Sequence, residues 1–310
     1  MTGPLPASVE LPDAVEILRC QLCGGDGHRT KFRDGPFSVR ECTACGLVYV
    51  TPRLSGEALA KVYGEGYWKS DNPKSRGYAD YAREASLYLK TFQRRMALVR
   101  DWIPQGGRVL DVGCAAGYFM QVMREHGHKV LGVEPSAAIA TIARQELGEH
   151  AVFVGDLADA PQELGYRDGA FDLITLWDVI EHIPDPQATL RRLRAMLAPG
   201  GRLLLETQNV NSRWARLLGR RWHHYKHEEH LYHFRPETIR RLLQDCGFRV
   251  LHLGAGHAGK YVSLAFIAER AGRLGRVAGA LASPLRLLGS CNLYVNPRDE
   301  MIVVAEPGGA

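Results

Sequence analysis

The stretch Val109-Leu-Asp-Val-Gly-Cys-Ala-Ala-Gly-Tyr-Phe119 decides the fold of this chain. It begins as a short buried strand and continues as a glycine-containing turn that opens a helix. Gly113 and Gly117 carry no side chain, so a ligand can come close to the backbone of the turn. The spacing differs from the Gly-x-Gly-x-x-Gly of dinucleotide sites. Asp111, just before the turn, is a poor neighbour for a pyrophosphate and a good one for the cationic end of an amino acid.

Outward from this turn, strand and helix patterns alternate along the chain. The alternation predicts an α/β fold with a parallel sheet covered by helices on both faces. We expect strands at residues 108–111, 129–134, 152–154, 171–176, 201–208, 249–253 and 301–305. We expect helices at residues 118–126, 137–147, 186–197 and 236–246.

Two further acids follow the next two strands. Glu134 ends the second strand and Asp156 follows the third, so both would meet Asp111 at the carboxyl edge of the sheet, where such folds bind ligands. With these three acids, the chain from about residue 106 onward resembles the class I S-adenosylmethionine-dependent methyltransferases. Ala115 stands where their glycine motif has its middle glycine. The resemblance implies a Rossmann-like, seven-stranded sheet whose last strand is antiparallel.

The resemblance also implies a site for S-adenosylmethionine. Glu134 would accept hydrogen bonds from both ribose hydroxyls, a task that suits a carboxylate. Asp156 would receive the adenine amino group, and Asp111 would face the cationic amino-acid end. The other residues that we expect at the cofactor are Gly113, Gly117, Leu157 and Trp177.

Four of the seven cysteines form two pairs, Cys20-Gln-Leu-Cys23 and Cys42-Thr-Ala-Cys45. Two such pairs at this separation predict a tetrahedral Zn²⁺ site with four thiolate ligands, and redox-active dithiols are the alternative. A four-thiolate site has no open position, so we expect a structural role. Loss of the metal should then unfold this segment without direct loss of chemistry. The order of ribbon, helical link and methyltransferase core resembles a bacterial group of small-molecule and glycan methyltransferases.

Two segments should lie beyond the sheet edge and face the methyl group. The first is Leu176-Trp-Asp-Val-Ile-Glu-His-Ile-Pro184, after the fourth strand. The second follows the fifth strand and holds five of the twelve histidines: His223, His224, His227, His230 and His233. Because imidazole titrates near neutral pH, His182 or one of these histidines is the candidate general base. A structural role for His182, orienting the loop, is the alternative.

The same residues also allow a catalytic divalent ion such as Mg²⁺. Asp178, Glu181 and His182 are spaced i, i+3, i+4, so a helical turn would place them on one face. Together with His230 or His233 they resemble the metal-binding set of some O-methyltransferases. Solvated or capping histidines are the alternative.

Two further groups of residues have more than one interpretation. Aromatic side chains before the core could cap the cofactor, line the acceptor pocket or belong to the core: Tyr67, Trp68, Tyr78 and Tyr81. Between the last two strands, apolar residues recur every three or four positions from Leu264 to Leu281, and arginines flank them. This pattern predicts an amphipathic helix that serves as a lid or touches a membrane surface.

The chain therefore divides into four regions. They are a zinc ribbon (16–52), a helical linker or cofactor cap (53–105), the catalytic domain (106–256 and 299–310) and a helical insertion acting as a lid (257–298).

Composition narrows the choice of function. Apolar residues make up 45% and charged residues 24% of the 310 residues, as in soluble globular proteins. No run of 18 apolar residues and no signal-peptide pattern occurs, so we expect a cytoplasmic protein. We expect methyl transfer to oxygen or carbon of a small-molecule, sugar or lipid-linked acceptor. An RNA methyltransferase is the alternative, but the net charge of +5 is modest, and Arg33, Arg40 and Arg53 are too sparse for a basic stripe. The oligomeric state is left open.

Overall fold

The computed structural model describes residues 14–55, 58, 68, 84–288 and 291–308. Tyr67, Tyr78 and Tyr81, for which a cofactor cap, the acceptor pocket and the core were considered, lie outside the described residues. Within the described residues, no helix is long and apolar enough to cross a membrane.

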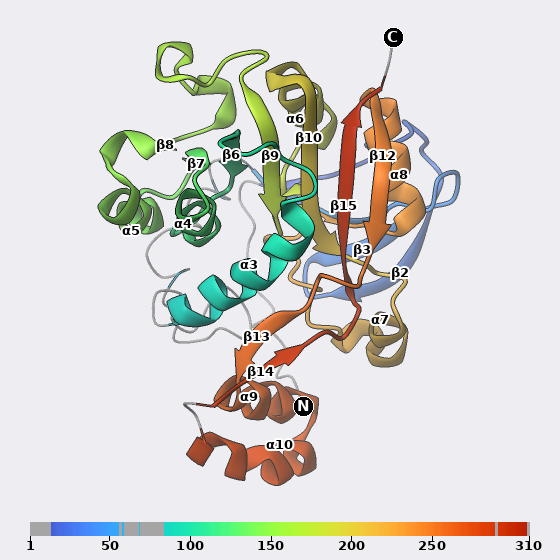
Figure 1. Ribbon diagram of the computed structural model, residues 1–310. Coiled ribbons are helices and arrows are strands. Elements are labelled where there is room, and N and C mark those ends of the chain that lie inside the picture. The colour runs from blue at the N-terminus through green and yellow to red at the C-terminus, as the bar shows by residue number, and fades with distance from the viewer. Residues whose placement is uncertain (1–13, 56–57, 59–67, 69–83, 289–290, 309–310) are drawn as a thin grey trace.

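A seven-stranded sheet forms the centre of the molecule, in the order β12-β15-β10-β9-β6-β7-β8 (Figure 1). Strands β10, β9, β6, β7 and β8 run parallel, and β15 is antiparallel to both of its neighbours. This confirms the predicted Rossmann-like α/β fold with an antiparallel last strand. The strands are β6 (Arg108–Val112), β7 (Lys129–Glu134), β8 (Val152–Val154), β9 (Phe171–Trp177), β10 (Leu197–Gln208), β12 (Phe248–Gly254) and β15 (Glu300–Pro307).

Helices cover both faces of this sheet because successive strand residues point to opposite sides. Val109 of β6 belongs to the same core cluster as Phe119 of α4, whereas its neighbour Leu110 packs in the cluster that holds Leu193 of α6. One face thus carries α3, α4 and α5, and the other carries α6 and α8. Their bounds are α3 (Ala85–Val99), α4 (Tyr118–Glu125), α5 (Ala137–Leu147), α6 (Pro186–Met196) and α8 (Pro236–Asp245).

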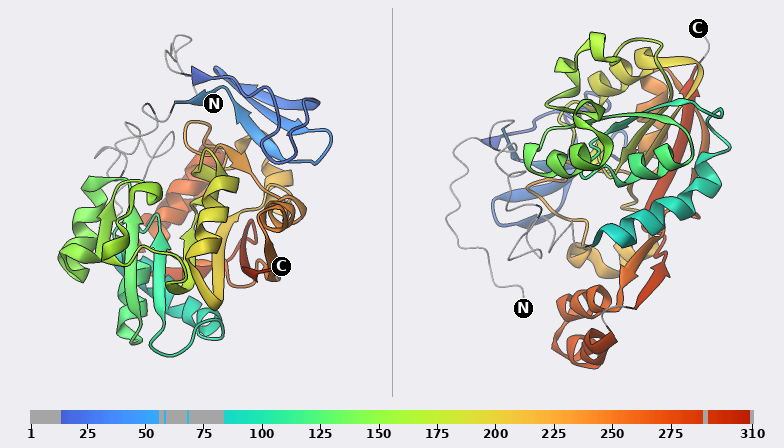
Figure 2. Two further views of the ribbon diagram at one scale, coloured as in Figure 1. Left: turned by 90° about the horizontal axis from the view of Figure 1, so that it is seen from above. Right: turned by 60° about the vertical axis from the view of Figure 1, so that its left-hand side comes forward.

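The N-terminal ribbon, residues 14–54, lies beside the catalytic sheet (Figure 2). Its own strands are β1 (Ala14–Val15), β2 (His28–Asp34), β3 (Phe37–Cys42), β4 (Val48–Thr51) and β5 (Arg53–Leu54). The fourth strand of its larger sheet comes from the histidine-rich segment of the catalytic domain. This strand, β11 (Tyr232–His233), pairs antiparallel with β4, with Tyr232 opposite Tyr49 and His233 opposite Val48. The sequence analysis did not predict this shared sheet.

The insertion before β15 differs in part from the predicted amphipathic helix. It begins and ends with an antiparallel hairpin, β13 (Lys260–Ser263) with β14 (Asn292–Val295). Between these strands the helical pattern divides at Gly275 into α9 (Leu264–Leu274) and α10 (Arg276–Ala282). In Figure 1 these elements lie below the sheet, at the carboxyl ends of β9 and β10. Val277 and Leu281 are exposed on α10, and membrane contact through the insertion stays a prediction.

Candidate active site

The glycine turn after β6 requires its two glycines for different close contacts. Gly113 has φ +71°, and a Cβ there would lie 2.6 Å from a methyl carbon of Val179 in the loop after β9. Gly117 has φ +72°, and its Cβ would lie 2.9 Å from Leu147 at the end of α5. Ala115 also adopts a positive φ, +47°. Alanine thus accepts the left-handed backbone at the position where the family motif has glycine, at a modest conformational cost.

The first two acids are buried at neighbouring strand ends. Asp111 is 2% exposed and accepts a hydrogen bond of 2.6 Å from the Thr175 hydroxyl. Glu134 accepts 3.0 Å and 2.8 Å bonds from the backbone N–H groups of Ala115 and Ser136. It therefore links the glycine turn to the start of α5. Burial raises the pKa of Asp111 to about 7 and the pKa of Glu134 to about 7.

The third acid and one aromatic residue flank this pair. Asp156 is exposed and accepts a 3.0 Å hydrogen bond from the backbone N–H of Ala158, which caps a short turn beginning at Leu157. Trp68 donates its indole N–H to the Ser136 hydroxyl at 2.9 Å, next to Glu134. The structure thus places Trp68 beside Ser136, just after the end of β7.

Trp177 lies between the sheet and the helices α3 and α4. Its ring centroid is 5.3 Å from that of Phe92 and 5.1 Å from that of Phe119. The guanidinium carbon of Arg95 lies 4.8 Å from its centroid, a cation–π distance. Direct contact of Trp177 with the cofactor stays a prediction.

The loop after β9 does not form the predicted helical turn. Asp178 has φ +55°, and only Ile180–His182 forms a short 3₁₀ turn. The Asp178 carboxylate therefore turns to Lys260 of β13, at 2.7 Å, rather than joining Glu181 and His182 on one face. The predicted helical turn was therefore wrong, and Asp178, although near Glu181, lies outside the group of ligand atoms that Glu181 and His182 form with His230.

Glu181, His182 and His230 come together, with ligand atoms within 4.8 Å of one another. The rings of His182 and His230 lie 4.7 Å apart and nearly perpendicular. Burial, and then the nearby Asp178, raises the pKa of Glu181 to about 8, and its carboxyl accepts a bond from Thr207. Burial lowers the pKa of His182, and that of His230 well below its usual value, which favours neutral imidazoles.

His233 is not one of this group, although its ring centroid lies 6.3 Å from that of His230. It is fully buried, its ring packs 4.7 Å from that of Tyr225, and its Nδ1 lies 3.4 Å from the Gln208 amide nitrogen. Within the described residues, the predicted metal set is therefore reduced to Glu181, His182 and His230.

A partly buried charge network joins the insertion to the sheet. Lys260 contacts Asp178 at 2.7 Å and Glu300 at 2.8 Å, and Arg95 of α3 pairs with Glu206 of β10 at 2.6 Å. The sequence analysis singled out Asp178 but missed its partners Lys260 and Glu300 and the pair of Arg95 and Glu206. Glu206 carried a signal, a charge directly after the apolar run Leu203-Leu-Leu205 of a predicted strand, whereas its partner Arg95 lies 111 positions away.

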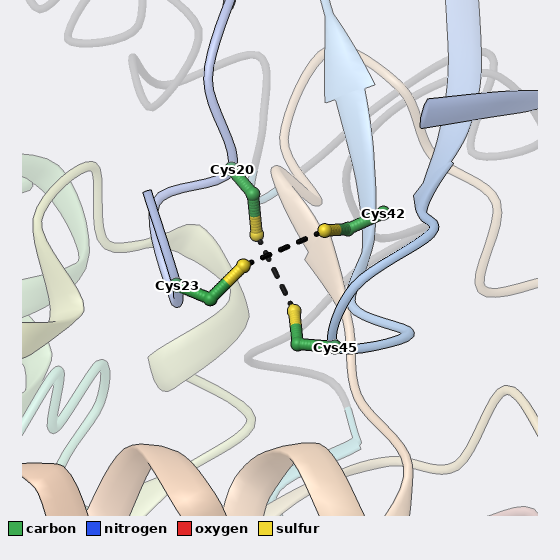
Figure 3. Close-up of side chains that lie close together, drawn as sticks. All are labelled: Cys20, Cys23, Cys42 and Cys45. Carbon is green, nitrogen blue, oxygen red and sulfur yellow. Dashed lines mark hydrogen bonds between the residues drawn. The ribbon is translucent and has the colours of Figure 1, made fainter. Parts of the chain in front are cut away.

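The four cysteines of the N-terminal ribbon converge on one point (Figure 3). Cys20 and Cys45 have their sulfur atoms 3.5 Å apart, as do Cys23 and Cys42, and none is in a disulfide. A tetrahedral Zn²⁺ site with bonds of about 2.3 Å places its sulfur atoms about 3.8 Å apart. The donor set and its geometry therefore fit zinc closely.

Backbone bonds connect this ribbon to the cluster of Glu181, His182 and His230. Leu231 donates its N–H to the Glu181 carbonyl at 2.9 Å and accepts a 3.0 Å bond from the N–H of Val50 in β4. The Tyr232 hydroxyl donates to the carbonyl of Pro184 at 2.8 Å. The ribbon thus helps to hold both segments that were expected to face the acceptor.

Comparison with known proteins identifies the family. Residues 81–253 match the family described as "Methyltransferase domain", which covers more than half of the chain. The chain belongs to this family and is a class I S-adenosylmethionine-dependent methyltransferase.

The relatives carry a more specific name. A ubiquinone biosynthesis O-methyltransferase of Xanthomonas euvesicatoria is 31% identical over 196 residues, which cover 59% of this chain and 76% of the relative. A protein of the same name from Xanthomonas campestris (strain B100) is 35% identical over 172 residues, which cover 52% and 68%. For the Xanthomonas axonopodis protein of this name, the match spans 64% of its length. Among solved structures, the fold is shared with a chain from the complex between the Haloferax volcanii Trm112 methyltransferase activator and a methyltransferase. The two chains are 18% identical, with a TM-score of 0.51. The match covers 78% of this chain and 96% of the other.

We predict that the affinity for S-adenosylhomocysteine rises about tenfold per carboxyl group from about pH 6 to about pH 8. Asp111 and Glu134, with pKa values of about 7, must lose their protons before they can pair with a cation or accept hydroxyl hydrogen bonds as carboxylates. Titration calorimetry of the wild type measures this slope. Glu134→Gln should bind weakly and show a smaller slope, whereas the exposed control Glu146→Gln should match the wild type. A pH-independent affinity in the wild type would contradict the assignment.

The shared sheet changes the expectation for loss of the cysteine cluster. We predict that Cys20→Ser combined with Cys42→Ser lowers hydrogen-exchange protection not only in β4 but also at residues 231–233, because β4 supplies the partner of β11. Exchange in β7, a strand of the central sheet and not of the ribbon's sheets, serves as the internal control. Unchanged protection at residues 231–233 would show that the histidine segment holds its conformation without the ribbon.

Proposed function

We propose that this methyltransferase methylates a hydroxyl oxygen of a small molecule, with His182 as the general base. The observation that carries the proposal is the cluster of His182, Glu181 and His230. Glu181 and His182 follow Val179 in the chain, and the Val179 side chain lies against the glycine turn at Gly113. A base in this place would lie next to the donor end of the cofactor.

For this methyl transfer the protein has to align the methyl donor with the acceptor and to remove the proton of the acceptor hydroxyl. S-adenosylmethionine supplies a methyl group on a positively charged sulfur. The acceptor oxygen attacks the methyl carbon, the carbon–sulfur bond breaks with its electrons going to sulfur, and the hydroxyl proton passes to His182. A lowered pKa keeps His182 neutral, and thus able to accept this proton, at neutral pH.

We further propose that the three strand-end acids hold the cofactor as the resemblance implies. Asp111 would face the amino-acid end, Glu134 the ribose and Asp156 the adenine. The burial of the first two, the exposure of the third and the position of Trp68 beside Ser136 support this arrangement. Gly113 and Gly117 would admit the cofactor to the backbone, and Leu157 and Trp177 would line its site.

For the N-terminal ribbon we propose a structural Zn²⁺ held by Cys20, Cys23, Cys42 and Cys45. The four sulfur donors leave no open position for a substrate, so the ion would stabilise the ribbon and, through β11, the histidine segment.

A hydroxyl-bearing small molecule suits the acceptor side better than RNA does. The curated relatives are named for O-methylation in ubiquinone biosynthesis. Of the three ribbon arginines considered for RNA, Arg53 is 4% exposed and hydrogen-bonded to Tyr232, so it cannot contact a phosphate chain. A panel of acceptors should therefore contain hydroxylated ubiquinone precursors, sugars and lipid-linked sugars, with release of S-adenosylhomocysteine as the readout.

We predict that His182→Gln lowers kcat on the acceptor found in this panel by about 10²–10⁴-fold, the usual contribution of a general base. In the wild type, activity should fall as the pH falls through the pKa of His182, which burial places below its usual value. His182→Gln should lose this limb of the pH profile.

The affinity of His182→Gln for S-adenosylhomocysteine should equal that of the wild type, since the change lies on the acceptor side. His28→Gln, an exposed change in β2, is the matched control and should keep full activity. Full activity of His182→Gln would leave this residue with the structural role alone.

A further inference from the structure

A second group of histidines lies at the same edge of the sheet, outside the cluster assigned above. Asp299 precedes β15, and its carbonyl accepts a 2.7 Å bond from the N–H of Asn209, which follows β10. His223 and His224 lie in the histidine-rich segment after β10 and face the Asp299 carboxylate. The three residues offer two imidazole nitrogens and one carboxylate oxygen within 4.8 Å of one another.

The distances leave space between these atoms rather than hydrogen bonds. The Nε2 atoms of His223 and His224 both lie 3.7 Å from Oδ2 of Asp299. Nε2 of His224 also lies 3.6 Å from Oε1 of Glu300. This nitrogen is buried, in a residue only 9% exposed, and has no hydrogen-bond partner among the described residues. A buried polar atom without a partner is costly, and here it points at two carboxylates.

A hydrogen bond from Trp222 orients the Asp299 carboxylate. Trp222 donates its indole N–H to Oδ2 of Asp299 at 3.0 Å, and the Trp222 ring packs 4.8 Å from that of His224. Metal-binding carboxylates commonly have such hydrogen-bonded support, which orients the ligand before the ion arrives.

The charges around this point favour a cation. Four carboxyl groups gather there, Asp178, Glu206, Asp299 and Glu300, all at least partly buried. Among the described residues, the cations that contact them are Lys260 and Arg95. If all four acids are ionised, two negative charges are in excess, and a buried surplus of this kind requires protons or a cation.

We propose that His223, His224 and Asp299 bind a divalent transition-metal ion, with Glu300 next to it as a further oxygen donor. Two imidazoles with carboxylates suit Zn²⁺, Mn²⁺, Fe²⁺ or Co²⁺ better than Mg²⁺, which prefers oxygen ligands alone. With bonds of about 2.1 Å, a nitrogen and an oxygen on one ion lie about 3.0–3.4 Å apart, so each imidazole nitrogen would need to approach the Asp299 oxygen by about 0.3–0.7 Å. A role toward the acceptor's oxygen atoms would rest on the proposed function, but binding of the ion does not.

Counting metal ions on the full-length protein tests this site. The protein is first loaded with Zn²⁺, which the cysteines hold most tightly, and then titrated with Co²⁺. We expect one further equivalent of Co²⁺, with the visible absorption of nitrogen and oxygen ligation and without the strong near-ultraviolet band of thiolate ligation. Mass spectrometry of the dialysed protein gives the metal content independently.

Variants show whether the second equivalent occupies the proposed residues. His224→Phe and Asp299→Asn should weaken Co²⁺ binding at least tenfold, and Asp299→Asn keeps an oxygen for Trp222. His223→Gln changes a more exposed side chain, so it tests the site even if a buried variant fails to fold. His227→Phe, at another buried histidine of the same segment that pairs with Asp34, is the matched control and should bind as the wild type does.

Absence of a second equivalent, or equal binding by all four variants, would overturn the proposal. Loss of the second equivalent in His182→Gln but not in His224→Phe would move the ion to the other histidine cluster and also overturn it. None of these measurements uses methyl transfer, so a failure of the proposed function would show separately, as a wild type that binds Co²⁺ but methylates no acceptor of the panel.

Discussion

The convergence of parallel strand ends on one edge is the constraint on which the rest of the structure depends. Because β6 and β7 lie side by side and end together, Asp111 and Glu134 meet in a buried place, where Glu134 also holds the glycine turn through the N–H of Ala115. Burial raises the pKa of both carboxyl groups to about 7, so each exchanges a proton near neutral pH. A ligand that brings a positive charge and hydroxyl donors compensates this cost, so the edge is prepared for such a ligand before it binds.

The region around Glu181 and His182, where we propose that the acceptor binds, is built from segments that lie far apart in the sequence. The N-terminal ribbon contributes β4, the histidine-rich segment contributes β11, and the insertion contributes Lys260, which reaches Asp178. Each part is short and has little core of its own. Their mutual hydrogen bonds and ion pairs therefore connect the ribbon and the insertion to the candidate active site.

Sequence reasoning worked where the signal was local and periodic. Strand and helix patterns predicted all seven strands of the central sheet, and the paired cysteines predicted the cluster in which their sulfur atoms meet. It failed at Asp178, because the i, i+3, i+4 spacing has its meaning only in a helix. The positive φ at that residue turns the side chain to Lys260 instead. The histidine segment was recognised by its composition alone, which could not tell that His182 pairs with His230 while His233 packs against Tyr225.

The amino-acid sequence by itself determined the class of fold, the strand-end acids and the four-cysteine set, because each depends on residues close together in the chain or on a motif of fixed spacing. Only the tertiary structure decided which histidines meet, that β11 completes the sheet of the ribbon, and that His223 and His224 face Asp299 across 75 positions or more. Such contacts depend on how distant segments are brought to one edge of the sheet. Local sequence patterns do not predict which distant segments meet at this edge, because their positions follow from the packing of the whole chain.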